Sequence, residues 1–176
     1  MSRHNRRNHK SALQPPAGVG IDGTTRVQRP SHEVFKPVFE KALDVAKSKL
    51  HTTGEIGITA LFVYGKAPEV SLNASATHVS LRYKDEFHKE AVRRKIHEKV
   101  AAESVSAVVL LFPDPSDREG TFLISGAMAG TTADASITYT FDKATKTFNF
   151  SEMVWRDESV NNFFLEGLFS ARDGAT

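Results

Sequence analysis

The stretch "DEFHKEAVRRKIHEKVAAESVSAVVLLF" (residues 85–112) decides the fold, because it joins the clearest helix of the chain to a buried strand. Asp85 stands where an N-cap accepts hydrogen bonds from the first free amides of a helix. The closing "SAVVLLF" (106–112) is a short apolar run, which is typical of a strand covered on both faces. Apolar residues at helical spacing define the helix face that we expect to be buried, namely Phe87, Ala91, Val92, Ile96 and Val100.

A similar helix and two strands are expected upstream of this unit. A stripe of apolar residues predicts a helix that ends near Gly54, and we place its start near Pro37, since a start at Ser31 would require Pro37 to kink it. "EIGITALFVYG" (55–65) predicts a central strand. "SATHVSLRY" (75–83) alternates polar and apolar residues and predicts a half-buried strand.

Downstream, three further strands and a short C-terminal helix are expected. The strands are "TFLISGAMA" (121–129), "ASITYTF" (135–141) and "TFNFSEMVW" (147–155), the last two joined by the hairpin loop "DKATK". Residues 157–169 predict the short helix.

The resulting element order is α-β-β-α-β-β-β-β-α, which predicts the α+β class. We expect a single mixed β-sheet of about six strands with the two long helices on one face. The strand–helix–strand unit at 75–112 predicts a right-handed crossover between parallel neighbours, and the strands after it predict an antiparallel meander. Residues 31–170 form the expected domain, and residues 171–176 a frayed end.

Composition excludes several kinds of chemistry. The chain of 176 residues has no cysteine, so disulfides, thiolate metal sites and cysteine nucleophiles are excluded. Its longest apolar runs fall well short of the roughly 18 residues that span a bilayer. No secretory signal pattern is present at the N-terminus, so we expect a cytoplasmic protein that makes no membrane contact.

Residues 1–30 predict a basic, flexible arm. The segment holds six basic residues against one acidic residue, whereas the whole chain has a net charge of only +2. Proline and glycine interrupt any regular structure there. A solvated tail explains this composition, and sequence-nonspecific binding of nucleic-acid phosphates is the alternative. The residues of the arm that could contact phosphates are Arg3, Arg6, Arg7 and Lys10.

The histidines and carboxylates allow one candidate metal site. His78, Asp85 and His88 flank the junction between a strand and the long helix, and imidazole with carboxylate is a donor set that suits zinc or iron. Solvated positions on a strand and a helix explain the same residues without a metal. If they converge, the chain would be a metal-dependent hydrolase.

Aromatic residues gather near the C-terminus. Phe163 and Phe164 are adjacent, so they point about 100° apart on a helix and one face cannot easily bury both. An exposed aromatic group there would mark a partner surface, whereas a fully packed one would complete the core. The residues of this candidate partner surface are Trp155, Phe163, Phe164 and Phe169.

No phosphate-binding loop, nucleophile elbow or zinc-protease motif occurs in the sequence. We therefore expect no cofactor and favour a non-enzymatic domain that binds another protein or a second copy of itself. Metal-dependent hydrolysis and nucleic-acid association through the arm are the alternatives.

Overall fold

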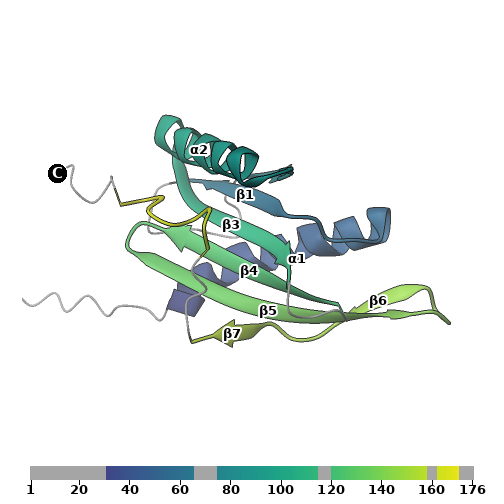
Figure 1. Ribbon diagram of the computed structural model, residues 1–176. Coiled ribbons are helices and arrows are strands. Elements are labelled where there is room, and N and C mark those ends of the chain that lie inside the picture. The colour runs from purple at the N-terminus through teal and green to yellow at the C-terminus, as the bar shows by residue number, and fades with distance from the viewer. Residues whose placement is uncertain (1–30, 66–74, 115–119, 158–161, 171–176) are drawn as a thin grey trace, which may run out of the picture.

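The computed structural model describes residues 31–65, 75–114, 120–157 and 162–170. These ranges contain two helices and seven strands, and both helices pack on one open sheet (Figure 1). The predicted α+β class is therefore confirmed. The elements are α1 (Ser31–Thr53), β1 (Thr59–Tyr64), β2 (Ala76–Ser80), α2 (Glu86–Ala102), β3 (Val105–Pro113), β4 (Thr121–Met128), β5 (Thr131–Asp142), β6 (Thr147–Phe150) and β7 (Val154–Arg156).

The strand order is β2-β1-β3-β4-β5-β6, with β7 paired to β5 beside β6. Every pairing among the described strands is antiparallel. The predicted meander is confirmed, since β3, β4, β5 and β6 are neighbours in chain order. The predicted parallel neighbours are wrong, because β1 lies between β2 and β3 and runs antiparallel to both.

The two helices lie on opposite faces of the sheet, so the prediction that they share a face is wrong. Leu61 of β1 and Val109 of β3 pack with α1, whereas the alternate residues Phe62 and Val108 pack with α2. Figure 1 shows the sheet between the helices. Because β1 and β3 are apolar on both faces, each face requires its own cover.

α1 begins at Ser31, six residues before the predicted start near Pro37, and it holds Pro37 in its interior. Proline cannot donate the helical hydrogen bond to the carbonyl of Glu33. The extra turns bring Phe35 into the core, where it is 0% exposed. Burying a phenylalanine side chain stabilises a fold by about 1.5–3 kcal/mol, which offsets much of the cost of the proline. The predicted end at Gly54 is confirmed by its φ of 78°.

The predicted strand at 147–155 is divided into β6 and β7. Tyr139 lies opposite Phe150, and Ser136 lies opposite Val154, so three residues of this strand face two residues of β5. Such an extra residue is a β-bulge. Ser151 bridges the gap, because its amide donates to the carbonyl of Thr138 and its hydroxyl accepts from the amide of Thr138.

Residues 162–170 form consecutive turns, so the predicted C-terminal helix is not found there. The Asn162 side chain accepts from the amide of Phe164, which favours a turn over a continued helix. Gly167 then adopts a φ of 70°, in the left-handed region that interrupts a helix. No helix among the described residues has the length and apolar character needed to cross a bilayer.

Candidate functional site

β2 forms one edge of the sheet, and all five of its residues are exposed. β1 pairs with its inner side, where His78 lies opposite Leu61. None of the residues that the structure describes pairs with its outer side. The predicted strand is confirmed, but its predicted half-burial is wrong, because neither helix covers this end of the sheet.

The backbone of β2 directs alternate hydrogen-bonding groups away from the sheet. The amide of Tyr64 donates to the carbonyl of Ser75, and the amide of Leu81 donates to the carbonyl of Ile58. In an antiparallel ladder such hydrogen-bonded pairs alternate with pairs whose amides and carbonyls point outward. Ala76, His78 and Ser80 are therefore the residues whose backbone groups face outward along this edge.

The side chains of β2 also divide between the two faces. His78 and Ser80 lie on the same face of the sheet as α1, and the Lys49 ammonium donates to the Ser80 hydroxyl at 2.7 Å. Thr77 and Val79 lie on the same face as α2, and the Thr77 hydroxyl is 3.3 Å from the Tyr64 hydroxyl. The strand is thus bonded to the fold on both faces, while no described strand pairs with its outer side.

A charged cluster supports β2 from the side of α2. Tyr64 donates to Glu103 at 2.7 Å, and Lys99 donates to the same carboxylate at 2.6 Å. The hydrogen bond to Glu103 raises the pKa of Lys99, and the hydrogen bond from Lys99 lowers the pKa of Glu103. Both groups therefore remain charged at neutral pH, and they hold Tyr64 beside Thr77.

Exposed apolar groups lie on and after this edge. Val79 is 47% exposed, and Phe87 in the first turn of α2 is 87% exposed. The predicted burial of Phe87 is therefore wrong, since among the α2 residues only Ile96 and Val100 are buried. A hollow of about 450 Å³ is formed mainly by the segment that joins β2 to α2, and it is lined by Ile58, Leu81, Arg82, Tyr83, Lys84 and His88.

The opposite edge of the sheet differs from β2. It is divided into β6 and β7, which have four and three residues, and the bulge between them interrupts the ladder. β7 also ends in the charged residue Arg156. Short strands, bulges and charges are features that prevent an edge from pairing with another chain. β2 has no bulge, proline or charged residue, and shortness is the only one of these features that it shares.

The candidate partner surface at the C-terminus is largely packed inside the chain. Phe164 and Phe169 are each 6% exposed and join the cluster beneath α2. Trp155 is partly buried and stacks on Phe39 of α1 at a centroid distance of 5.0 Å. Phe163 is also partly buried, so none of these four side chains is among the exposed large apolar residues.

Two basic side chains of α2 contact residues 162–170. Lys89 and Arg93 lie 4.9 and 5.1 Å from the centroid of the Phe163 ring, and Arg93 also donates to the carbonyl of Glu166. His97 donates to the carbonyl of Phe164, while its buried Nε2 atom has no hydrogen-bond partner among the residues that the structure describes. Burial and the nearby Arg93 lower the pKa of His97, so the segment is docked against a neutral imidazole.

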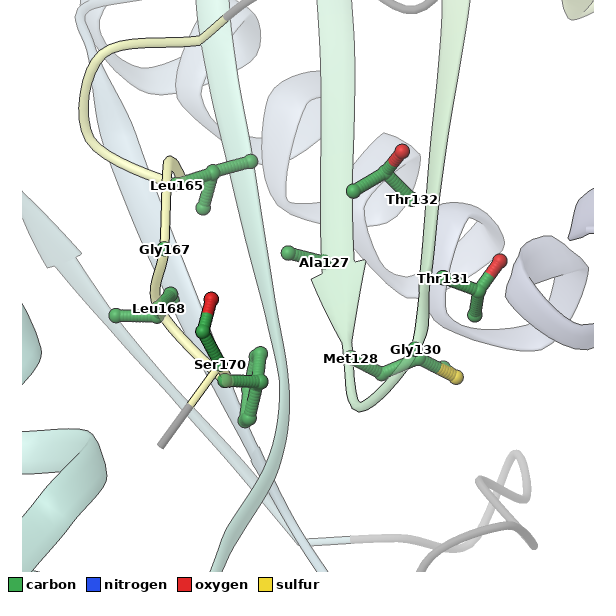
Figure 2. A pocket seen from close by; sticks show the side chains of 10 residues that line it. Ala127, Met128, Gly130, Thr131, Thr132, Leu165, Gly167, Leu168 and Ser170 are labelled. Carbon is green, nitrogen blue, oxygen red and sulfur yellow. The ribbon is translucent and has the colours of Figure 1, made fainter. Parts of the chain in front are cut away.

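A hollow of about 490 Å³ separates this segment from the turn between β4 and β5 (Figure 2). Leu165 and Ala127 point toward one another across it, and the hydroxyl of Ser170 lies on the same side as Leu165. None of the described residues that line the hollow has a titratable side chain. These residues therefore offer apolar contact and hydroxyl groups, but no group for acid–base chemistry.

The burial of one acidic residue, Asp134, was not predicted from the sequence. Asp134 of β5 is 4% exposed and accepts a hydrogen bond from Ser125, its neighbour on β4. Arg156 lies opposite Asp134 on the other side, so the three residues follow one another across β4, β5 and β7. The signal in the sequence was an acidic residue directly before the predicted strand at 135–141, and β5 includes it because this strand begins at Thr131. Because Ser125 satisfies it, we assign this group to the stability of the sheet.

The structure does not bring the candidate metal ligands together. His78 lies on β2, Asp85 caps α2 by accepting from the amide of His88, and the His88 side chain is exposed. Within the described ranges, no three histidine, aspartate or glutamate side chains are grouped so that they could hold a metal ion. Asp85 thus has the capping role that its position in the sequence predicts.

The arm residues Arg3, Arg6, Arg7 and Lys10 lie outside the described residues, so their contact with nucleic acid stays a prediction. Comparisons with protein-family models, curated protein sequences and solved structures find no match for this chain.

Proposed function

We propose that this chain is a protein-interaction domain that binds a partner by adding a strand to the outer edge of β2. The observation that carries the proposal is the open backbone at Ala76, His78 and Ser80, whose amides and carbonyls face outward from a strand with every residue exposed. Strand addition obtains its affinity from such main-chain groups and its specificity from alternate side chains.

The side chains of the edge support the same function. Val79 offers an exposed β-branched surface on the α2 side, and β-branched residues favour cross-strand packing. We place the interaction surface here rather than at the C-terminal aromatic residues, since Phe164 and Phe169 are already buried within the chain.

Site-specific photo-crosslinking tests the proposal. A photoreactive phenylalanine analogue replaces Val79 in the full chain within its native cells, and the matched control replaces Val154, which is 59% exposed on the opposite edge. We expect a covalent adduct from position 79 and none from position 154. Adding His78→Pro to the first variant should abolish the adduct, because it removes an outward amide without touching the ladder to β1.

The result is informative in either direction. An adduct that depends on the His78 amide supports strand addition, whatever the partner is. If position 79 forms no adduct, or if positions 79 and 154 react equally, strand addition at β2 is wrong.

A further inference from the structure

We propose that the strand added to β2 is β2 of a second copy of this chain, paired antiparallel about a two-fold axis through His78. This inference rests on the proposed function and names its partner. It follows from three properties of the edge, which are the symmetry of its backbone pattern, its side-chain pairs and its lack of charge.

The outward backbone groups are symmetric about the centre of the strand. They belong to the first, third and fifth residues of β2, which are Ala76, His78 and Ser80. A two-fold axis at His78 places Ala76 opposite Ser80 of the copy and His78 opposite itself. Each of these pairs exchanges two N–H···O bonds, so every outward group along the strand is satisfied.

The side chains are compatible with this register. On the α2 side, Val79 lies opposite Thr77 of the copy, and this β-branched pair occurs twice across the axis. Such positions lie between the hydrogen-bonded pairs, where Cα atoms are about 4.5 Å apart, so the exposed Val79 would be covered. On the α1 side, the small residues Ala76 and Ser80 face one another and leave room for the imidazole of His78.

Charge does not oppose the pairing. β2 contains no lysine, arginine, aspartate or glutamate. The nearest cation bonded to it is Lys49, which donates to Ser80. The Ser80 residues of the two copies would be about 14 Å apart, from four residues at about 3.4 Å each. This separation exceeds the Debye length of about 10 Å at 0.1 M salt, so the two Lys49 cations repel one another only weakly.

The expected dimer is weak and depends on concentration. Pairing two five-residue strands falls at the small end of specific interfaces, which suits a dissociation constant on the order of micromolar. In the dimer the two sheets would join into one continuous sheet, with the divided β6 and β7 edges at its two ends.

Disulfide formation between engineered cysteines tests which residues of the two β2 strands lie opposite one another. The chain has no cysteine of its own that would interfere. Ala76→Cys and Ser80→Cys are made as separate full-length proteins and oxidised alone or mixed. We expect the mixture to form disulfide-linked heterodimers on the order of tenfold faster than either protein forms homodimers, since pairing raises the local concentration only for opposed positions. His78→Cys should crosslink to itself. Val154→Cys on the opposite edge is the control for random collision.

Sedimentation velocity on the unmodified chain provides the second measurement. The weight-average mass should rise toward that of a dimer with increasing concentration, and His78→Pro should abolish this rise. His78→Ala keeps the amide and should leave the rise in place. Circular dichroism of both variants verifies that the monomer is folded, and the cysteine variants supply the test if His78→Pro does not fold.

The outcomes separate this inference from the proposed function. Preferential Ala76–Ser80 crosslinking with self-association that needs the His78 amide supports the two-fold pair. A chain that stays monomeric, with cysteines that react no faster than Val154→Cys, overturns it. If that chain still crosslinks another protein from position 79, the proposed function stands and only the identity of the partner is wrong.

Discussion

The ring of Phe35 in α1 occupies the space that a side chain at Gly126 in β4 would need. A Cβ atom at position 126 would lie 2.6 Å from the Cε1 atom of Phe35 and equally close to the ring of Phe39. The absence of a side chain at this position therefore lets α1 approach the sheet. Close packing between α1 and β4 therefore requires glycine at position 126.

Gly126→Ala should destabilise the protein by about 1–3 kcal/mol, because two buried rings must shift to accept the methyl group. The measurement is chemical denaturation followed by circular dichroism. Gly57→Ala is the matched control, since nothing lies within 4 Å of the added atom there. Equal stability of the two variants would show that α1 does not pack as closely as the structure indicates.

Ser125→Ala should cost about 1–3 kcal/mol of stability, because it removes the hydroxyl that donates to the buried carboxyl group of Asp134. Ser106→Ala is the comparison, since that hydroxyl is also buried but donates to the neutral carbonyl of Val63. We expect its loss to cost about 0.5–1.5 kcal/mol. A smaller effect at position 125 than at position 106 would contradict a stabilising role for the Ser125–Asp134 pair.

Acid should weaken the docking of residues 162–170 through His97. Burial and Arg93 lower its pKa from the ordinary value of 6.5, with opposing effects from the Phe164 carbonyl and Glu90. The folded state thus binds the proton less well than the unfolded state. The stability that neutral His97 contributes is present above about pH 6.5 and is lost as the pH falls toward the folded pKa.

Urea unfolding at pH 7.5 and pH 5.5 tests this linkage in wild type and in His97→Gln. The variant should lose less stability on acidification than wild type does. His88→Gln is the control, because the His88 side chain is exposed, and it should behave like wild type. An identical pH dependence in all three proteins would rule out a contribution from His97.

Phe163→Leu should destabilise the protein by about 0.5–2 kcal/mol, because leucine keeps much of the apolar contact but has no ring face for Lys89 and Arg93. Phe87→Leu makes the same change at a ring that is 87% exposed, and its effect should stay within about 0.5 kcal/mol. Thermal unfolding of the two variants compares them directly. Equal effects would mean that the two cations do not fasten the C-terminal segment.

Much of the fold was predictable because local signals marked its elements. Asp85 caps α2 as its position predicts, and the strands after α2 form the expected meander. The hairpin at "DKATK" is confirmed, with Asp142 opposite Thr147. Capping residues, apolar spacing and short polar loops act within a few residues of one another. They can therefore be recognised in the sequence without knowledge of the tertiary structure.

The exposed edge at β2 was not predictable in the same way. The alternation in "SATHVSLRY" indicates a strand with one buried face, and β2 is that strand, yet all its residues are exposed. Alternation of polar and apolar residues predicts that one face of a strand is buried. It does not predict whether the strand lies at the centre or at the edge of the sheet. The burial of Asp134 likewise depends on Ser125, which reaches it only when β4 and β5 pair.

The sequence by itself determined most of the helices and strands, the α+β class and the lack of thiol chemistry, because each follows from residue type and short-range spacing. Only the tertiary structure decided that β1 separates β2 from β3, that the helices cover opposite faces and that β2 is an exposed edge strand. The physical reason is that strand order and burial depend on contacts between segments far apart in the chain. The same contacts determine which backbone groups remain available to a partner.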